Sequence, residues 1–222
     1  MRRKETDQYV GCGLYTLGQA ARLLHLRPNV LRYWIGGVGA ASIVSRKIAT
    51  DPVLTFAELM ELHFVKLFRD QGVPFRAIRK AAKAAELKFN SPYPFTVKRF
   101  DTDGKTIFAT LKRDETKKTV VEDLEKGQLV FQKIIRPFFK KLDYGTTDVE
   151  RFWPLKKRGR IVLDPQRRFG KPIDFETGIS TDAIAKAVAA GDGQDVKTVA
   201  KWFDIPVEAV KAAIRFEKSL AP

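Results

Sequence analysis

Cysteine and histidine are scarce in this chain. Its 222 residues include one cysteine, Cys12, and two histidines, His25 and His63. A single cysteine excludes an internal disulfide, and these three residues do not share the close spacing of metal ligands. The sequence therefore predicts no metal site. His63 falls inside an apolar helical stretch and is expected to be a packed or surface histidine rather than a ligand.

The chain also lacks the motifs that mark common enzyme classes. It shows no support for a Ser-His-Asp set, no HExxH sequence and no glycine-rich phosphate loop, since Gly170-Lys171 is followed by Pro172. We expect no catalytic residues, no cofactor and no enzymatic activity. No apolar run is long enough to cross a membrane, and none follows the basic residues 2–4 as in a signal peptide. A cytoplasmic protein that does not contact membranes is expected.

Positive charge exceeds negative charge in every part of the chain. The 41 Lys and Arg residues outnumber the 26 Asp and Glu residues, which gives a net charge of +15. Residues 1–90 carry 15 basic and 7 acidic side chains, a larger excess than in residues 91–155 or 156–222. This excess favours a polyanionic partner, most simply duplex DNA, although positive charge alone also serves solubility.

Residues 13–35 have the pattern of a helix-turn-helix. Apolar residues recur at helical spacing from Leu17 to Leu24, a short break follows, and Pro28 suits the first position of a second helix. Asparagine can bond adenine, and arginine can bond guanine or phosphate, from such a helix. The candidate DNA-binding side chains here are Arg27, Asn29, Arg32 and Tyr33. The alternative from periodicity alone is a two-helix corner with solvated charges.

These residues resemble the start of the MerR family, in which a Tyr-Thr strand leads into a GxxAxLL helix and a helix ending LRYW. Residues 56–79 resemble that family's next helix pair, with Gly72 ending one helix and Pro74 starting the next. The resemblance implies a MerR-like winged-helix domain, which we place at residues 1–90. The matching positions in the first segment are Tyr15, Thr16, Gly18, Ala21, Leu23, Leu24, Leu31, Arg32, Tyr33 and Trp34.

The wing of that domain is expected between residues 36 and 52. Arg46 and Lys47 lie inside a β-like run there, and at a wing tip they would meet phosphates or the minor groove. An ordinary solvated loop is the alternative.

Residues 91–155 are predicted to form a β-hairpin followed by a helix. Residues 95–100 alternate as in a strand, residues 101–104 read as a turn, and residues 105–112 would return, with residues 119–124 as a third strand. Apolar residues then recur at helical spacing over 129–142, where Pro137 should kink or shorten the helix. This apolar stripe is expected to be core, or else a dimerisation surface. MerR regulators usually continue here into a long dimerising helix, which this pattern does not show.

The remaining residues, 156–222, are predicted to form a small helical domain entered by a basic connector at 151–160. A short strand at 161–163 and three helices at 181–190, 196–203 and 206–220 are expected. The connector side chains are candidates for contacting an acidic pocket on a partner or nucleic acid, with a solvated linker as the alternative. They are Lys156, Lys157, Arg158 and Arg160.

From Asp164 onward the chain resembles a small domain family common in predicted antitoxins, with a "DP" turn and a "GkPvirGTRipv" segment. Where that motif reads irGTR, this chain has Asp174-Phe175-Glu176-Thr177-Gly178, so the role of the motif's arginine is not carried over. The matching positions are Asp164, Pro165, Gly170, Lys171, Pro172, Ile173, Thr177, Ile179, Gly191, Trp202 and Phe203.

The order of winged helix, middle module and small helical domain resembles VapB-type antitoxins. The resemblance implies a type II antitoxin that neutralises a PIN-like ribonuclease toxin and represses its own operator as a DNA-bound homodimer. Basic residues at 156–160, or the helices after Thr181, would mask the acidic metal site of such a toxin. The alternative is a MerR-like ligand-responsive regulator without a toxin. The expected fold class is mainly α with short β elements, an α+β protein.

Overall fold

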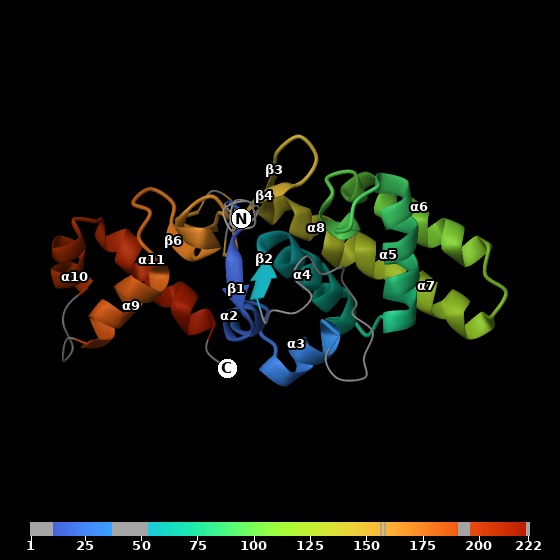
Figure 1. The fold of residues 1–222 in the computed structure, drawn as a ribbon, viewed down its shortest axis with the longest axis horizontal. Helices are drawn as coiled ribbons and strands as arrows, with labels where there is room; N and C mark the ends of the chain where they lie inside the picture. Colours follow the sequence, from blue (N-terminus) through green and yellow to red (C-terminus); the bar gives the residue numbers. More distant parts are fainter. Residues whose placement is uncertain (1–10, 37–52, 156, 158, 191–195, 221–222) are drawn as a thin grey trace, which may run out of the picture.

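The fold is mainly helical with short antiparallel strands, as a computed structural model of the chain shows (Figure 1). The structure describes residues 11–36, 53–155, 157, 159–190 and 196–220. The predicted class, mainly α with short β elements, is confirmed. The N-terminal elements are β1 (Leu14–Thr16), α2 (Leu17–Leu23), α3 (Pro28–Trp34), β2 (Val53–Thr55), α4 (Phe56–Asp70) and α5 (Phe75–Phe89).

Strands β1 and β2 pair antiparallel, and each ends at a threonine that caps the helix after it. The Thr16 hydroxyl accepts a hydrogen bond from the backbone N–H of Gln19, and the Thr55 hydroxyl accepts one from Glu58, both at 3.3 Å. In turn, the side chains of Gln19 and Glu58 accept a hydrogen bond from the backbone N–H of the threonine that caps their helix. Two capping boxes of this kind fix where α2 and α4 begin relative to the strand pair.

Three helix pairs of the described chain share one corner geometry. The corner residue is left-handed, with φ of 49° at His25, 74° at Gly72 and 50° at Asp204. The next residue in each corner donates its N–H to the carbonyl five positions earlier, which satisfies the end of the first helix. These bonds are Leu26 to Ala21 at 2.8 Å, Val73 to Phe68 at 3.0 Å and Ile205 to Ala200 at 2.9 Å.

The hairpin predicted at residues 95–112 is wrong, because Pro94–Thr96 form a 3-10 turn and the chain from Phe100 onward belongs to an antiparallel helix pair. Helices α6 (Phe100–Arg113) and α7 (Lys118–Val130) replace both the hairpin and the strand predicted at 119–124. Gly104 serves close packing rather than a turn, since a Cβ there would lie 2.3 Å from the Phe131 ring. Gly127 in α7 is matched in the same way, because a Cβ there would lie 2.5 Å from the Phe108 ring.

The helix predicted at 129–142 is present as the end of α7 and the turns that follow it. A π-helical turn at Phe131–Ile135 leads into the short α8 (Arg136–Phe138), which contains Pro137. A 3-10 turn follows at Phe139–Lys141. Regular α-helical bonding is interrupted here, as expected near a residue without an N–H. Ile135, Phe138 and Phe139 of this stripe are buried, whereas Leu129 at its start is 51% exposed, so most of the stripe is core.

A second antiparallel sheet links the middle of the chain to its C-terminal helices. Its strand order follows the sequence. Residues 151–152 were predicted as part of a connector, but they end a strand in which Phe152 pairs with both neighbouring strands. The strands are β3 (Leu142–Tyr144), β4 (Val149–Phe152), β5 (Ile161–Leu163) and β6 (Pro172–Asp174).

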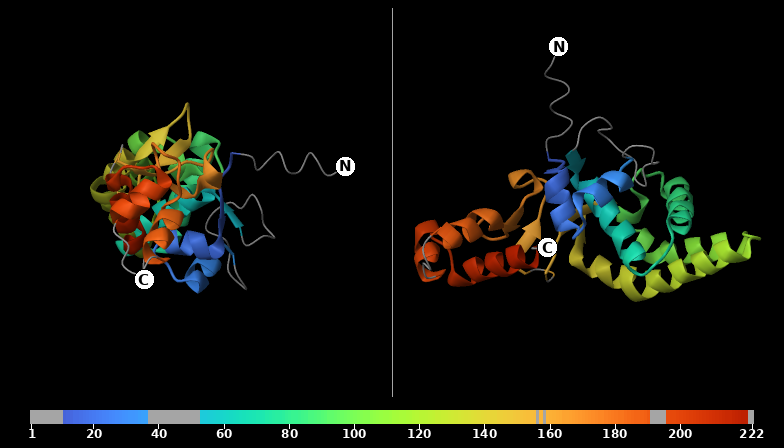
Figure 2. Two further views of the ribbon diagram at one scale, coloured as in Figure 1. Left: turned by 90° about the vertical axis from the view of Figure 1, so that its left-hand side faces the viewer. Right: turned by 90° about the horizontal axis from the view of Figure 1, so that it is seen from below.

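The three C-terminal helices are confirmed within one residue of the predicted bounds. They are α9 (Thr181–Ala190), α10 (Val196–Phe203) and α11 (Val207–Ser219). Figure 2 shows them on one side of the N-terminal helix pair, with α6 and α7 on the other.

Helix α11 is buried on two faces. Ala209 and Val210 pack with α9 and α10 in a small cluster, whereas Phe216 and Leu220 belong to the main core that also contains Tyr15. That main core crosses both of the domain boundaries proposed from the sequence, at 90 and 155, and the three-part division stays a prediction.

Candidate nucleic-acid interface

Helix α3 carries the side chains that the sequence pattern predicts to contact DNA. Leu31 and Trp34 are buried, and Trp34 meets the Phe75 ring edge-on at 5.5 Å, which orients α3 on the core. The opposite side is open to solvent, and Tyr33 there is 58% exposed. The other exposed candidates on this side are Arg27, Asn29 and Arg32.

Arg27, Arg32 and Tyr33 make no side-chain hydrogen bond or ion pair with the described residues. Asn29 differs, because its side-chain oxygen accepts a hydrogen bond from the Val30 N–H at 2.9 Å. This bond uses one of the two acceptor sites of the amide oxygen and neither N–H of the amide. Polar atoms of all four side chains therefore have capacity left for a ligand.

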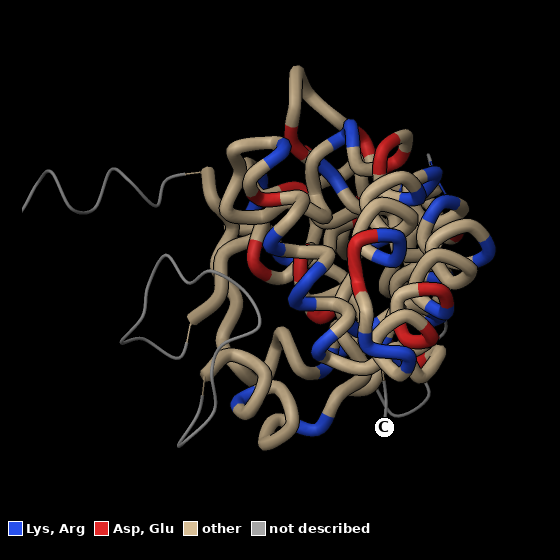
Figure 3. Tube along the Cα trace, turned by 90° about the vertical axis from the view of Figure 1, so that its right-hand side faces the viewer, with Lys and Arg blue, Asp and Glu red and all other residues tan. Residues whose placement is uncertain are grey.

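Local charge sets α2 and α3 apart from the rest of the surface. Residues 11–36 contain Arg22, Arg27 and Arg32 and no Asp or Glu. Figure 3 views the molecule from the end formed by α6 and α7, where acidic and basic positions are mixed. At the lower left of the same view, where α2 and α3 lie, the tube carries basic positions alone. Arg22 is paired with Glu217 of α11, so Arg27 and Arg32 are the cations of this segment that have no acidic partner among the described residues. Such cations attract phosphate.

The basic side chains of α5 belong to a different arrangement. Arg76 pairs with Asp123 and Lys80 with Glu115, so α5 is joined to α7 and to the loop that precedes it. Arg69 and Arg79 lie over the Phe75 ring at 4.5 and 5.6 Å. These cations stabilise contacts within the protein, and they are less suited to contacting a phosphate backbone.

The structure describes only some of the remaining predicted site residues. Arg46 and Lys47 of the expected wing, and Lys156 and Arg158 of the basic connector, lie outside the described residues. Lys157 donates to the Leu142 carbonyl at 2.9 Å and lies 3.2 Å from the Asp143 carboxylate.

Arg160 binds the buried Asp174 through two hydrogen bonds of 2.6 and 2.9 Å, and its third nitrogen is 2.8 Å from Glu176. Burial lowers the pKa of Arg160, but the bonds and charges of Asp174 and Glu176 outweigh this and raise it. Arg160 therefore joins β5 to the turn after β6. Its contact with a partner, like that of Lys157, stays a prediction and would require an internal pair to be exchanged.

His63 is packed, as one of its two expected environments. Its ring stacks on Phe138 at 4.6 Å and meets Phe152 at 5.2 Å. Burial, reinforced by the charges of Lys66 and Lys141, lowers its pKa to about 3. Across the described part of the chain, no three His, Cys, Asp or Glu side chains gather where they could hold a metal ion. In the same part, none of the helices has the length and apolarity to cross a bilayer.

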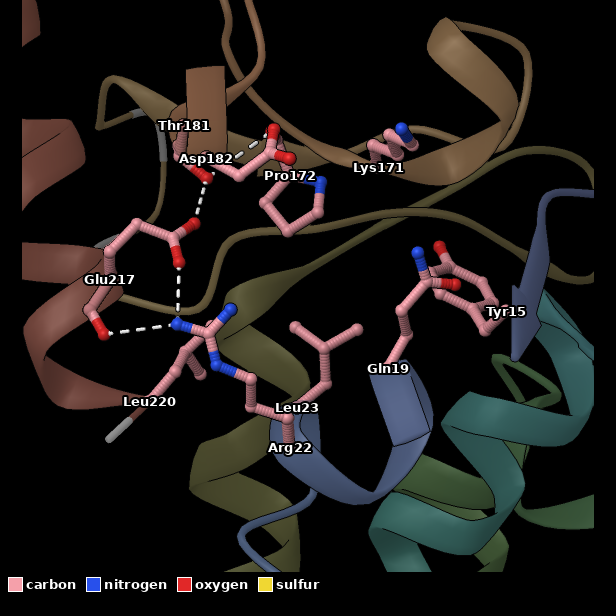
Figure 4. A pocket seen from close by; sticks show the side chains of 10 residues that line it. All are labelled: Tyr15, Gln19, Arg22, Leu23, Lys171, Pro172, Thr181, Asp182, Glu217 and Leu220. Carbon is pink, nitrogen blue, oxygen red and sulfur yellow. Dashed lines mark hydrogen bonds and ion pairs between the residues drawn. The ribbon is translucent and has the colours of Figure 1, made fainter. Parts of the chain in front are cut away.

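The helix-turn-helix is held against the C-terminal helices at a small polar junction (Figure 4). Arg22 of α2 donates to the Glu217 carboxylate of α11 at 2.7 Å, and Glu217 also accepts from the Thr181 hydroxyl. Beside it, the Tyr15 hydroxyl donates to the Gly170 carbonyl at 2.6 Å. The helix pair α2–α3 is therefore fixed to the C-terminal lobe, the described residues from 161 onward, by side chains far apart in sequence.

One feature of the C-terminal lobe was not predicted from the sequence. Arg168, Phe169 and Gly170 are left-handed in succession, with φ of 50°, 56° and 81°. Each non-glycine residue in this region costs roughly 1–2 kcal/mol. The only sequence signal is Gly170 after two arginines and a phenylalanine, which marks a turn without indicating that the phenylalanine is displayed.

Residues 161–216 match a family model described as "Protein of unknown function (DUF433)". The chain is 24% identical over 200 residues to a Mycobacterium tuberculosis (strain ATCC 25618 / H37Rv) protein described as "Putative antitoxin VapB45", and the match covers 80% of this chain and 83% of that protein.

The crystal structure of Rv2018 from Mycobacterium tuberculosis is similar to this fold. It superposes with a TM-score of 0.72 at 18% sequence identity, and the match covers 90% of this chain and 96% of that one. At this identity the likeness shows a common fold.

Proposed function

We propose that this chain is the antitoxin of a type II toxin–antitoxin pair, which neutralises a PIN-like ribonuclease and represses its own operator. The observation that carries the proposal is the similarity to a protein described as "Putative antitoxin VapB45", which extends over most of both chains. The match of residues 161–216 to DUF433 falls where the sequence resembles a domain of predicted antitoxins. We further propose that the protein is cytoplasmic, where both partners would be met, and that it has no enzymatic activity.

The DNA-binding part of the proposal rests on the exposed face of α3. Read as a MerR-like winged helix, residues 1–90 place α3 in the major groove, with Arg27 and Arg32 toward phosphates or guanine and Tyr33 beside them. A helix-turn-helix of this size usually binds as a dimer to two half-sites one helical turn, about 34 Å, apart. The proposal therefore includes a homodimer on a palindromic operator.

Toxin neutralisation is tested by co-expression with the PIN-like protein encoded beside this gene. The expected results are restored growth of cells that express that protein and co-purification of the two chains. Absence of such a neighbour, together with DNA binding that changes when a small molecule is added, would support a ligand-responsive regulator and contradict the proposal. A nuclease assay on the purified chain should show no activity.

DNA binding is tested with a fragment of the gene's own promoter and the variant Arg32→Ala. Loss of a base or phosphate contact should weaken binding by about 5- to 150-fold, since a good contact contributes about 1–3 kcal/mol. Arg113→Ala is the matched control, because this arginine is 77% exposed on α6, away from α3. Unchanged promoter binding by Arg32→Ala, or loss of both DNA and toxin binding with loss of the fold, would contradict the assignment of Arg32.

A further inference from the structure

The loop Arg168–Lys171, here called the Phe169 loop, displays an aromatic ring on a sterically disfavoured backbone. Phe169 is 76% exposed, so burial of its ring does not offset the cost of its left-handed backbone. Single exposed apolar residues are common on protein surfaces. What distinguishes this one is that two consecutive non-glycine residues adopt φ of 50° and 56° to place it there. Conformations of this kind cluster at binding sites.

Hydrogen bonds hold the Phe169 loop on both sides, a buried one at Gly170 and two part-buried ones at Asp164. At one end, the Asp164 carboxylate accepts from the Gln166 N–H and from Arg151, each at 3.0 Å. At the other end, the Tyr15 hydroxyl holds the Gly170 carbonyl at 2.6 Å. Arg167, just before the loop, donates to the Phe175 carbonyl at 2.8 Å. The backbone is therefore set before any partner arrives, and a partner would lose little affinity to ordering it.

The surroundings of Phe169 are basic and partly apolar. Arg168 is exposed and makes no side-chain hydrogen bond or ion pair with the described residues, and Lys171, two positions after Phe169, is also exposed. Ile179 and Ala183 form the apolar side of a shallow hollow that these residues line together. An aromatic side chain with flanking cations fits a partner surface that has an apolar pocket bordered by carboxylates.

We propose that the Phe169 loop is the anchor through which this chain binds the acidic face of its PIN-like toxin, with Phe169 in an apolar pocket and Arg168 against a carboxylate. This rests on the proposed function and names the surface that performs it. It moves the toxin contact from residues 156–160, where Lys157 and Arg160 are engaged within the protein, to side chains that are unengaged. An anchor that is both aromatic and pre-positioned carries a large share of an interface's affinity.

The test measures the affinity of the full chain for the PIN-like protein encoded beside it, by calorimetry. Phe169→Asn removes the ring and keeps a residue that tolerates the left-handed region. It should raise the Kd at least tenfold, whereas Phe169→Tyr should stay within threefold. Leu87→Asn is the matched control, because Leu87 is 74% exposed on α5, and it should change the Kd less than twofold.

A charge variant tests the loop independently. Arg168→Glu should raise the Kd at least tenfold, and Arg113→Glu, on exposed α6, less than twofold. All variants should keep one cooperative thermal transition, since the altered side chains are exposed. Phe169→Asn should not lower the midpoint, because asparagine tolerates the left-handed region better than phenylalanine.

Three results would overturn the inference. If the unsubstituted chain forms the complex and Phe169→Asn and Arg168→Glu bind equally well, the toxin contact lies elsewhere and the proposed function stands. If these variants lose promoter binding and keep the toxin, the loop serves nucleic acid. If the unsubstituted chain binds no PIN-like partner, the proposed function fails and this inference fails with it.

Discussion

Arg22 and Glu217 are 195 positions apart in the sequence, yet the Arg22 guanidinium lies 2.7 Å from the Glu217 carboxylate. The carboxylate is 12% exposed and also accepts a hydrogen bond from Thr181, whereas the Arg22 side chain is 49% exposed. The two side chains therefore do not contribute equally to stability, because Arg22 is half solvated and Glu217 is nearly enclosed.

Removing Glu217 should destabilise the protein more than removing Arg22. Glu217→Ala removes the carboxylate that accepts from Thr181 and Arg22 and leaves only the longer bonds to the Pro172 and Glu217 carbonyls, at 3.4 and 3.5 Å. It should lower the free energy of unfolding by about 1–3 kcal/mol. Arg22→Ala removes a partly solvated pair and should cost about 0.2–1 kcal/mol. Urea unfolding at pH 7 measures both. Lys186→Ala, which breaks an exposed pair with Asp182, is the control, and equal losses for all three variants would contradict the ranking.

Gly104→Ala should destabilise the protein even though alanine favours helices. A Cβ at this position would lie 2.3 Å from the Phe131 ring in a packed helix pair, and overpacking typically costs about 1–3 kcal/mol. Gly18→Ala in α2 is the control, since nothing lies within 4 Å of its added Cβ, and it should be neutral or stabilise by up to about 1 kcal/mol. The midpoint of thermal unfolding should therefore fall for Gly104→Ala and stay level or rise for Gly18→Ala, so that the two variants separate by several degrees.

Tyr15→Phe should destabilise the junction by about 1 kcal/mol. The change deletes the hydroxyl that donates to the Gly170 carbonyl at 2.6 Å, and leaves that buried acceptor without this donor. Tyr33→Phe removes the same atom from a tyrosine that is 58% exposed and should leave the unfolding midpoint unchanged. The measurement is chemical denaturation, and a neutral Tyr15→Phe would mean that water replaces the bond at no cost.

Stability should fall in acid through His63. Its pKa is lowered to about 3 in the folded state from an ordinary 6.5, so protons bind the unfolded chain first as the pH falls. The contribution is complete above pH 6.5 and is lost progressively between pH 6.5 and about 3, by at most about 1.4 kcal/mol per pH unit. His63→Phe keeps the stack on Phe138 and cannot titrate. The stability difference between this variant and the unsubstituted chain, measured at pH 7, 6 and 5, should shift steadily in favour of the variant, and a constant difference would contradict the pKa.

Local signals predicted the elements that they also determine. Pro28 at the start of α3, Gly72 at the end of α4 and the apolar spacing of α9 to α11 act within a few residues, and these elements were placed correctly. The exposed face of α3 followed from the same periodicity. Its chemical role stays a prediction, because exposure alone does not identify a ligand.

The middle of the chain was misjudged because its pattern depends on distant residues. Asp-Thr-Asp-Gly reads as a turn by itself, but Gly104 is needed as space for Phe131, which comes 27 positions later. The Phe169 loop was missed for a related reason. Its conformation depends on Tyr15 and Asp164, and nothing in residues 168–171 alone indicates that these two hold it.

The Tyr15–Gly170 bond also bears on how the chain folds as it is synthesised. The two residues are 155 positions apart, so at a synthesis rate of about 5–20 residues per second the hydroxyl waits roughly 8–30 s for its acceptor. During that interval, β1 and α2 lack the part of the core that Phe216 and Leu220 complete. The helix pair α2–α3 is thus among the first elements made and among the last to be fully supported, which makes the newly made N-terminal segment a natural target for chaperones and proteases.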